Sequence, residues 1–471
     1  MTQSHAAPAV PKSLPKRSGR LVLLLCFLTI VFDGYDLVVY GATVPTLLTH
    51  PTWDIDPARA GLIGSLALVG MLIGTLTVGA LTDILGRRKI MLFCIAWFSV
   101  CMLATAAAPN ETVFAVLRFL TGLGLGGVVP TCIALTVEYA PKSRRQIANA
   151  LMFSGYSVGG VGAAVLAMST LPALDFQWLY AVGALPLITL LPIAYKYLPE
   201  SIAFLAARRS PAEARATADQ IGLVYEDIVT ERPAAASVAA GVAAGAAGAS
   251  AAAAAAPARQ SSLRDLFSSR WRRSTLLFAA ANFCGLLLVY GLNTWLPQIM
   301  RGAGFELGSA LAFLLVLNLG AIVGSIGASW VADRIGIKKV VTASFILACI
   351  SIFLISLNLP VALLFVLVAF AGLGSVGTQI LVGGFCATHY PQRLSPTALG
   401  WSLGVGRIGA MMGPIIGGII ASTALGYQIN FYAFAAVAVL GAVVVSSVSS
   451  RSGEQGGALP APDLVAAATR A

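Results

Sequence analysis

Long apolar runs alternate with short polar stretches along almost the whole chain. Each run holds about 20 residues with few charges, which is the length that an α-helix needs to cross the ~30 Å hydrocarbon core of a bilayer. The pattern therefore predicts an all-α integral membrane protein with twelve transmembrane helices. The predicted spans are 21–48, 61–81, 90–108, 113–137, 148–171, 179–198, 274–299, 309–331, 340–357, 361–386, 398–424 and 429–447.

The composition supports a membrane location. Of the 471 residues, 58% are hydrophobic and only 10% are charged. Soluble domains carry roughly 25% charged residues, and a soluble fold this apolar would leave too much apolar surface in water.

Basic residues predict the orientation of the chain. Most of the 30 Lys and Arg residues lie in the termini and in alternate loops, whereas Arg59 and Arg301 lie in the opposite loops. Basic loops stay on the cytoplasmic side, so we expect a multi-pass protein of the cell inner membrane with both termini in the cytoplasm. The net charge of +11 is then a topology signal, and its dispersion over short loops argues against a nucleic-acid partner.

The longest polar stretch separates six predicted spans from six. Its middle, residues 233–257, consists almost entirely of Ala, Gly, Val and Ser, which is typical of a flexible linker. The predicted organisation is a cytoplasmic tail (1–20), a six-helix bundle (21–198), a cytoplasmic loop with the linker (199–273), a second six-helix bundle (274–450) and a cytoplasmic tail (451–471).

The two halves repeat each other at a constant offset. Asp83 and Gly86 in GALTDILGRRK correspond to Asp333 and Gly336 in ASWVADRIGIKK, each 250 residues later. Three glycines of span four, at 122, 124 and 127, recur in span ten at the same offset. A constant offset across two regions indicates a duplicated six-helix unit.

These features resemble the major facilitator superfamily. The loop GALTDILGRRK, its weaker second copy, RFLTGLGLGG in span four and PESIAFL after span six carry the likeness, which covers nearly the whole chain. The resemblance implies two six-helix bundles related by pseudo-two-fold symmetry, which flank a central site that opens alternately to either side.

Glycine motifs inside the spans favour helix packing. The string GLGLGG from Gly122 lies in an apolar span and follows no strand, so it is not a nucleotide-binding loop. The spacing of Gly155 and Gly159 likewise suits a close contact between helices.

Two acids lie inside the first span. Asp33 and Asp36, in the string DGYD, are spaced i and i+3 and so share one helix face. An acid at the bilayer centre costs ~2.5–3.5 kcal/mol on insertion scales, so we expect each to have a partner or a function. Burial and a neighbouring like charge both favour the protonated form, which suits proton coupling. The alternative is a static carboxylate neutralised by an arginine.

The string around these acids resembles the first-helix signature of aromatic acid:proton symporters. That signature is D-G-[FY]-D followed by small residues and a Pro, and this chain has DGYDLVVYGATVP from Asp33 to Pro45. The resemblance implies import of a small aromatic carboxylate, such as benzoate or a hydroxybenzoate, with both acids involved. Protons are the expected coupling ion, and no cofactor is expected.

An arginine in span four is placed to meet these acids. Arg118 is seven residues from Glu111 at the outer boundary, and Asp33 is 13 residues from Arg20 at the inner one. At 1.5 Å per residue, the two depths coincide in a ~30 Å core. We expect Arg118 to pair with Asp33 or Asp36 in at least one state and to take part in proton coupling. The alternative is an arginine that reaches toward the outer interface.

Arg407 lies near the midplane, ten residues into span eleven from Thr397. No acid occurs in the predicted spans seven to twelve, so the substrate can supply the anion, because a guanidinium binds a carboxylate bidentately. A cross-bundle pair with Asp36 and contacts with helix carbonyls are the alternatives.

Aromatic and amide side chains in the spans suit a flat ring that carries a carboxylate. Hydrogen bonds between packed helices explain the amides equally well. The predicted substrate contacts besides Arg407 are Tyr35, Tyr40, Asn282, Tyr290, Asn293 and Gln379.

Charged groups also cluster at the cytoplasmic ends of the helices. Glu138, at the end of span four, can relay protons inward or pair with Arg144 or Arg145. The loop after span two and its copy can form ion pairs in one conformation only and so bias a two-state equilibrium, although basic loops also follow from topology alone. The predicted gating residues are Asp83, Gly86, Arg87, Arg88, Asp333, Arg334 and Lys338.

Other functions fit the sequence less well. Sugar and polyol carriers share the PES and GRR-type motifs but usually have paired glutamines in span seven, and residues 282–293 contain none. A carrier of another organic anion and a non-transporting membrane sensor remain alternatives. We expect no enzyme, because no nucleophile–base pair or metal-ligand spacing occurs, and we expect the protein to act as a monomer.

Overall fold

The computed structural model describes residues 18–141, 145–208, 210–221, 263–357, 359–391, 394–423 and 426–449. Twelve helical stretches in these ranges are long and apolar enough to cross a membrane, which confirms the predicted number of spans. The Ala- and Gly-rich segment 233–257 lies outside the described residues.

Six spans form the first bundle. They comprise α1 (Ser18–Leu47), α2 (Pro57–Leu85), α3 (Arg87–Ala106), α4 (Glu111–Gly126) with α5 (Val128–Tyr139), α6 (Arg145–Thr170), and α7 (Gln177–Gly183) with η2 (Leu185–Leu187) and α8 (Leu190–Tyr197). Two short helices, α9 (Ile202–Arg208) and α10 (Pro211–Ile221), follow.

Six further spans form the second bundle, which the short helix α13 (Leu263–Leu266) precedes. They comprise α14 (Arg272–Gly302), α15 (Leu307–Ile335), α16 (Ile337–Ile355), α17 (Val361–Gly372) with the π-helical η4 (Leu373–Gly377) and α18 (Thr378–His389), α19 (Ser395–Ala421), and α20 (Gln428–Ser446).

Three spans depart from the continuous α-helices that the sequence pattern alone predicted. Span four divides at Gly127, span six contains a short 3₁₀ segment around Pro186, and span ten contains the π-helical η4. Glycine and proline weaken the regular hydrogen-bond ladder of a helix, and the apolar pattern does not record that effect.

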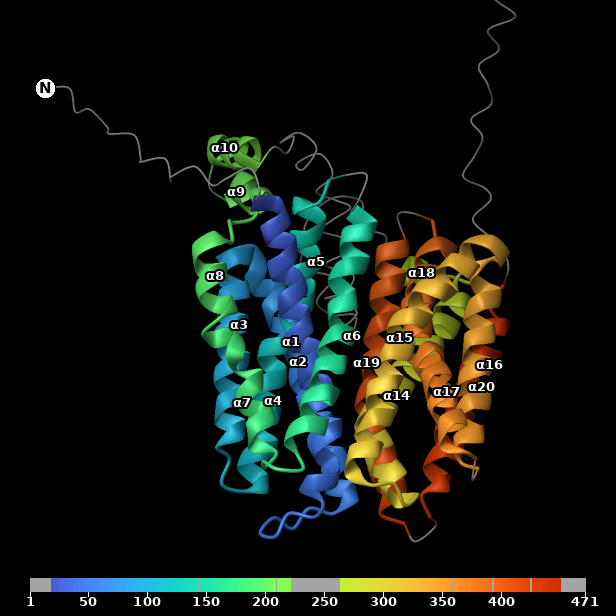
Figure 1. The fold of residues 1–471 in the computed structure, drawn as a ribbon. Helices are drawn as coiled ribbons and strands as arrows, with labels where there is room; N and C mark the ends of the chain where they lie inside the picture. Colours follow the sequence, from blue (N-terminus) through green and yellow to red (C-terminus); the bar gives the residue numbers. More distant parts are fainter. Residues whose placement is uncertain are drawn as a thin grey trace, which may run out of the picture.

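The two bundles stand side by side (Figure 1), one coloured blue to green and the other yellow to red. Helices α1, α2 and α6 of the first bundle contact α14, α19 and α15 of the second. We call the end that carries Arg20, Arg88, Lys196 and Lys339 the basic end, and α9 and α10 lie beyond it (Figure 1). The opposite end is called the far end.

Backbone contacts without intervening side chains join the bundles in their far halves. A Cβ on Gly41 of α1 would lie 1.9 Å from the Asn293 carbonyl oxygen of α14, and one on Gly61 of α2 would lie 2.4 Å from the carbonyl oxygen of Pro414 in α19. The Ser65 hydroxyl also donates to the Met411 carbonyl, at 2.7 Å. These contacts hold the bundles together at the far end.

Within the first bundle, α1 and α6 meet through glycines. A Cβ on Gly34 would lie 1.9 Å from the Tyr156 carbonyl oxygen, and one on Gly159 would lie 1.8 Å from that of Val31. The GxxxG spacing therefore marks a close helix contact, as predicted. Gly122 is also a packing glycine, since its Cβ would meet the Ala67 carbonyl oxygen at 1.9 Å.

Gly159→Ala should lower the melting temperature of the detergent-purified protein, because the added methyl group pushes α6 away from α1. Gly162→Ala is the matched control on the same helix, since nothing lies within 4 Å of its Cβ position. The control should be neutral or slightly stabilising, because Ala is the better helix former by ~1 kcal/mol. Equal melting temperatures for the two variants would contradict the packing assigned to Gly159.

Candidate functional site

A cavity lies between the two bundles and contains most of the buried charge of the spans. Its walls are largely apolar, with a few charged and hydroxyl groups, a combination typical of small-molecule sites. The lining residues are Asp33, Asp36, Leu37, Tyr40, Gly64, Ala67, Leu68, Met71, Arg118, Gly122, Leu125, Tyr156, Tyr290, Thr294 and Pro414.

Arg118 and Asp36 form a buried ion pair on one side of this cavity. The Arg118 guanidinium donates to the Asp36 carboxylate, and the two residues are only 2% and 5% exposed. The guanidinium carbon also lies 5.2 Å from the ring centre of Tyr40 and 5.9 Å from that of Tyr180. The pairing expected from helix depth is confirmed, and Arg118 does not reach toward the membrane interface.

The neighbouring acid has a different environment. Asp33 is 1% exposed, and neither of its carboxylate oxygens has a hydrogen-bond partner in the part of the chain that is described. Arg407 of the second bundle attracts it electrostatically, while donating a hydrogen bond to the Met71 sulfur at 3.0 Å. Arg407 is thus close to the cavity wall, and its alternative partner Asp36 is bound to Arg118.

The four residues of the string DGYD have four different environments. Asp33 borders the cavity, Gly34 contacts the α6 backbone, Tyr35 donates to the Leu179 carbonyl at 2.7 Å, and Asp36 binds Arg118. The Tyr35 hydroxyl is therefore used for helix packing. Tyr40, the second predicted aromatic contact of this helix, does line the cavity.

Several residues that line the cavity were not predicted from the sequence. Tyr156 of α6 shares a hydrogen bond of 3.0 Å with the predicted contact Tyr290 of α14, and so connects the two bundles directly. Its position next to Gly155, within the glycine-spaced face that meets α1, was the only signal in the sequence. Thr294 and Met71 also line the cavity without having been predicted.

The predicted amides lie away from the cavity. Asn282 donates to the Ser402 hydroxyl and accepts from Gln379 at 2.6 Å, while Asn293 accepts from Asn318 at 3.1 Å. These bonds join helices within the second bundle. In this structure Asn282, Asn293 and Gln379 therefore form hydrogen bonds between packed helices, which was the alternative to substrate contact.

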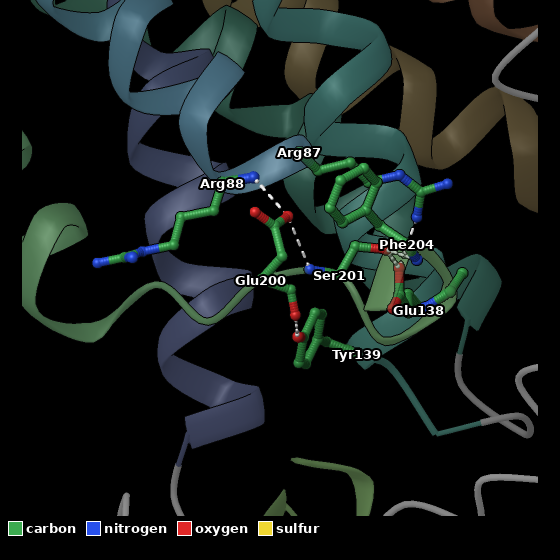
Figure 2. A network of polar contacts seen from close by, with 8 residues as sticks. Arg87, Arg88, Glu138, Tyr139, Glu200, Ser201 and Phe204 are labelled. Carbon is green, nitrogen blue, oxygen red and sulfur yellow. Dashed lines mark hydrogen bonds and ion pairs between the residues drawn. The ribbon is translucent and has the colours of Figure 1, made fainter. Parts of the chain in front are cut away.

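A separate polar network lies at the basic end (Figure 2). Arg87 at the start of α3 forms an ion pair of 2.5 Å with Glu138 at the end of α5. Glu138 also accepts from the Ser201 hydroxyl at 2.8 Å and from the Ala203 amide at 3.0 Å. The sequence predicted Arg144 or Arg145 as its partner, but these side chains lie outside the described part and the observed cation is Arg87.

Glu200 completes this network (Figure 2). Its carboxylate accepts from the backbone amides of Arg88 and Ser201, both at 3.0 Å, and so caps the start of α3. Gly86 is required here, because its φ is +94° and a Cβ would lie 2.5 Å from the Glu200 carboxylate. Of the predicted gating residues, Gly86 and Arg88 thus contact Glu200 in the segment after α8, and Arg87 binds Glu138 of α5. The Asp83 side chain lies outside the described part.

The duplicated copy has a different arrangement. Thr388 stands where the repeat would place an acid equivalent to Glu138. Lys338 donates to the Val448 carbonyl at 2.6 Å, Arg334 stacks 3.5 Å from the ring centre of Trp330, and Asp333 is exposed. No ion pair of these three residues occurs among the described residues in this conformation.

The comparisons with known proteins agree with this architecture. Residues 26–329 and 313–464 match the family model described as Major Facilitator Superfamily. This chain belongs to the Major Facilitator Superfamily.

The most informative relatives are transporters of aromatic acids. The superfamily member described here is 37% identical to the benzoate transport protein of Acinetobacter baylyi, over 91% of this chain and 89% of the relative. It is 37% identical to the gentisate transporter of Corynebacterium glutamicum (91% and 88% covered) and 32% identical to the 4-hydroxybenzoate transporter PcaK of Pseudomonas putida (91% and 92%). It groups with the aromatic acid family of the superfamily, as the DGYD string suggested.

Solved structures show the same fold. The partially occluded, inward-open xylose transporter XylE of E. coli matches with a TM-score of 0.69, covering 90% of this chain and 96% of that one. The sequence identity is 15%, so the likeness concerns the architecture of this superfamily member and not its substrate.

A double-mutant cycle tests the ion pair of Asp36 and Arg118 in this superfamily member. Arg118→Gln alone leaves a buried carboxylate without its cation, and breaking a buried pair costs ~3–5 kcal/mol. The melting temperature should fall clearly with Arg118→Gln and recover in part when Asp36→Asn is added. Additive losses would show that the two side chains do not interact.

The basic-end network gives a second stability prediction. Arg87→Ala should lower the melting temperature, since Glu138 is 5% exposed and would lose its cation. Lys89→Ala is the control, because Lys89 is the neighbouring base but is exposed. Similar melting temperatures for the two variants would rule out a stabilising role of the pair.

Proposed function

We propose that this protein is a secondary active transporter that imports a small aromatic carboxylate, such as benzoate or a hydroxybenzoate, together with protons. The observation that carries the proposal is the arginine Arg407 beside an apolar cavity that also holds the unpartnered acid Asp33. The cation can bind the carboxylate of such a substrate, the apolar wall can contact its ring, and the acid can carry the proton.

The surroundings of Arg407 in the second bundle support an anionic substrate. Arg407 lies about halfway along α19, and within the described residues it donates a hydrogen bond to the thioether of Met71, which is a weak acceptor. A substrate carboxylate would give the guanidinium two strong, charge-assisted hydrogen bonds. Leu37, Leu68 and Met71 offer the apolar surface that a benzene ring needs.

The names of the relatives narrow the substrate class. The transporters of benzoate, gentisate and 4-hydroxybenzoate share a carboxylate on a benzene ring as the common substrate chemistry. The present chain keeps a cation and apolar walls that match both parts of such a molecule.

The direction of opening follows from the basic residues. Basic loops stay in the cytoplasm, so the basic end would face the cytoplasm of the cell inner membrane, with both termini on that side. The contacts of Gly41 and Gly61 would then close the cavity toward the outside. Rocking of the two bundles around the cavity would open it to each side in turn, in one monomer and without a cofactor.

Transport by purified protein in liposomes tests this proposal. Labelled benzoate, 4-hydroxybenzoate, gentisate and xylose would be offered with an inwardly directed proton gradient, with and without an uncoupler. Accumulation of an aromatic acid that the uncoupler abolishes is the expected result. Uptake of xylose in its place would indicate a sugar carrier, and binding without flux would indicate a sensor.

Arg407→Gln should weaken benzoate binding about 10- to 100-fold, which corresponds to the ~1.5–3 kcal/mol of a charged hydrogen bond. Arg301→Gln is the matched control, since Arg301 lies at the exposed far end of α14. Isothermal titration of the two purified variants measures the difference. Equal affinities would remove Arg407 from the binding site.

A further inference from the structure

We infer that the two acids of the DGYD string have separate tasks. Asp33 carries the transported proton and, in its protonated form, shares the substrate carboxylate with Arg407, whereas Asp36 remains bound to Arg118 throughout the transport cycle. This inference rests on the proposed function and assigns its chemistry to individual atoms.

The first argument concerns the partners of the two carboxylates. Asp36 has its cation, Arg118, in hydrogen-bond contact, and the pair is enclosed by the rings of Tyr40 and Tyr180. Asp33 is more deeply buried than Asp36, and neither of its carboxylate oxygens has a hydrogen-bond partner among the described residues. An unpaired buried carboxylate is so costly that it must bind a proton or a cation, so Asp33 is the acid whose state can change.

The second argument concerns the bundles to which the cations belong. Asp36 and Arg118 lie on α1 and α4 of the same bundle, so a rocking motion between the bundles leaves their geometry unchanged. Arg407 lies on α19 of the other bundle, so its distance from Asp33 changes when the bundles rock. Only the second interaction can link a proton to a change of conformation.

The groups that face Asp33 come from four helices. They are Asp36 on its own helix α1, Cys132 on α5, Tyr156 on α6 and Arg407 on α19. Arg407 is the single cation of this described set, so it is the group that can stabilise an ionised Asp33. A substrate carboxylate that occupies Arg407 therefore removes this stabilisation and favours a proton on Asp33.

This exchange couples the two fluxes. On the outer side a proton from water binds a carboxylate oxygen of Asp33, which frees Arg407 for the substrate carboxylate, and the Asp33 O–H then donates a hydrogen bond to that carboxylate. On the cytoplasmic side the substrate leaves, the O–H bond breaks, and the proton passes to water. The ionised Asp33 then neutralises Arg407 during the return step, and one proton has moved with each substrate.

The test compares Asp33→Asn with the charge-free pair Asp36→Asn/Arg118→Gln in liposomes. An amide at residue 33 imitates the protonated acid, so Asp33→Asn should still exchange labelled benzoate for unlabelled benzoate but should not accumulate it from a proton gradient. A pH-sensitive dye inside the liposomes should show no proton entry with benzoate. The double variant, even if slower, should keep the proton-to-benzoate ratio of the unaltered protein.

Binding gives a second measurement that does not depend on flux. In the unaltered protein, benzoate affinity should fall by up to about tenfold per pH unit above the pH at which Asp33 loses its proton. In Asp33→Asn the affinity should not vary with pH. Titration calorimetry at several pH values measures both.

Several outcomes would overturn the inference. These are proton entry with benzoate in Asp33→Asn, a folded Asp33→Asn that neither binds nor exchanges benzoate, or loss of coupling in the double variant while exchange persists. If the unaltered protein itself neither binds nor exchanges an aromatic carboxylate, the proposed function fails. If the unaltered protein binds benzoate and transports it with protons, but the variants give one of the results above, the proposed function stands and only the separate tasks of Asp33 and Asp36 are rejected.

Discussion

The structure depends on one constraint, which is that a charge inside the apolar layer must be neutralised by a partner. The first bundle meets this constraint internally through Arg118 and Asp36, which are buried together and enclosed by tyrosine rings. That pair joins α1 to α4. Asp33 on α1 and Arg407 on α19 lie on opposite sides of the boundary between the bundles. The unsatisfied charge is thus concentrated where the bundles can move.

Close backbone contacts and one tyrosine pair join the bundles along this boundary. Gly41 and Gly61 allow the two bundles to meet without side chains between them in their far halves. Such contacts are held by dispersion and by the exclusion of lipid, which makes them easier to separate than an ion pair. The hydrogen bond between Tyr156 and Tyr290 crosses the same boundary near the cavity. The bundles are therefore held together by several contacts, each of which is weak on its own.

Much of this arrangement could be predicted from the sequence, because hydropathy, charge and depth act locally. The twelve spans, the packing role of Gly159 and the pairing of Arg118 with one of the acids followed from those rules. The partner of Glu138 did not, since Arg87 lies 51 residues away and is brought near only by the packing of α3 against α5. The amide Asn282 was predicted as a substrate contact, but it binds Ser402 of α19, and the sequence does not say which neighbour a buried side chain meets. The role of Tyr156 could not be predicted from its glycine neighbours alone, because its hydroxyl partner belongs to the other bundle.

The polar network of Glu138, Arg87 and Glu200 is not repeated in the duplicated half, because Thr388 stands at the position that corresponds to Glu138. A gene duplication begins with two identical units, so this difference arose by later divergence. In the first bundle these carboxylates join α3 and α5 to the segment after α8. Among the described residues the second bundle has no ion pair at the same place, so two units of nearly the same plan are secured unequally at the basic end.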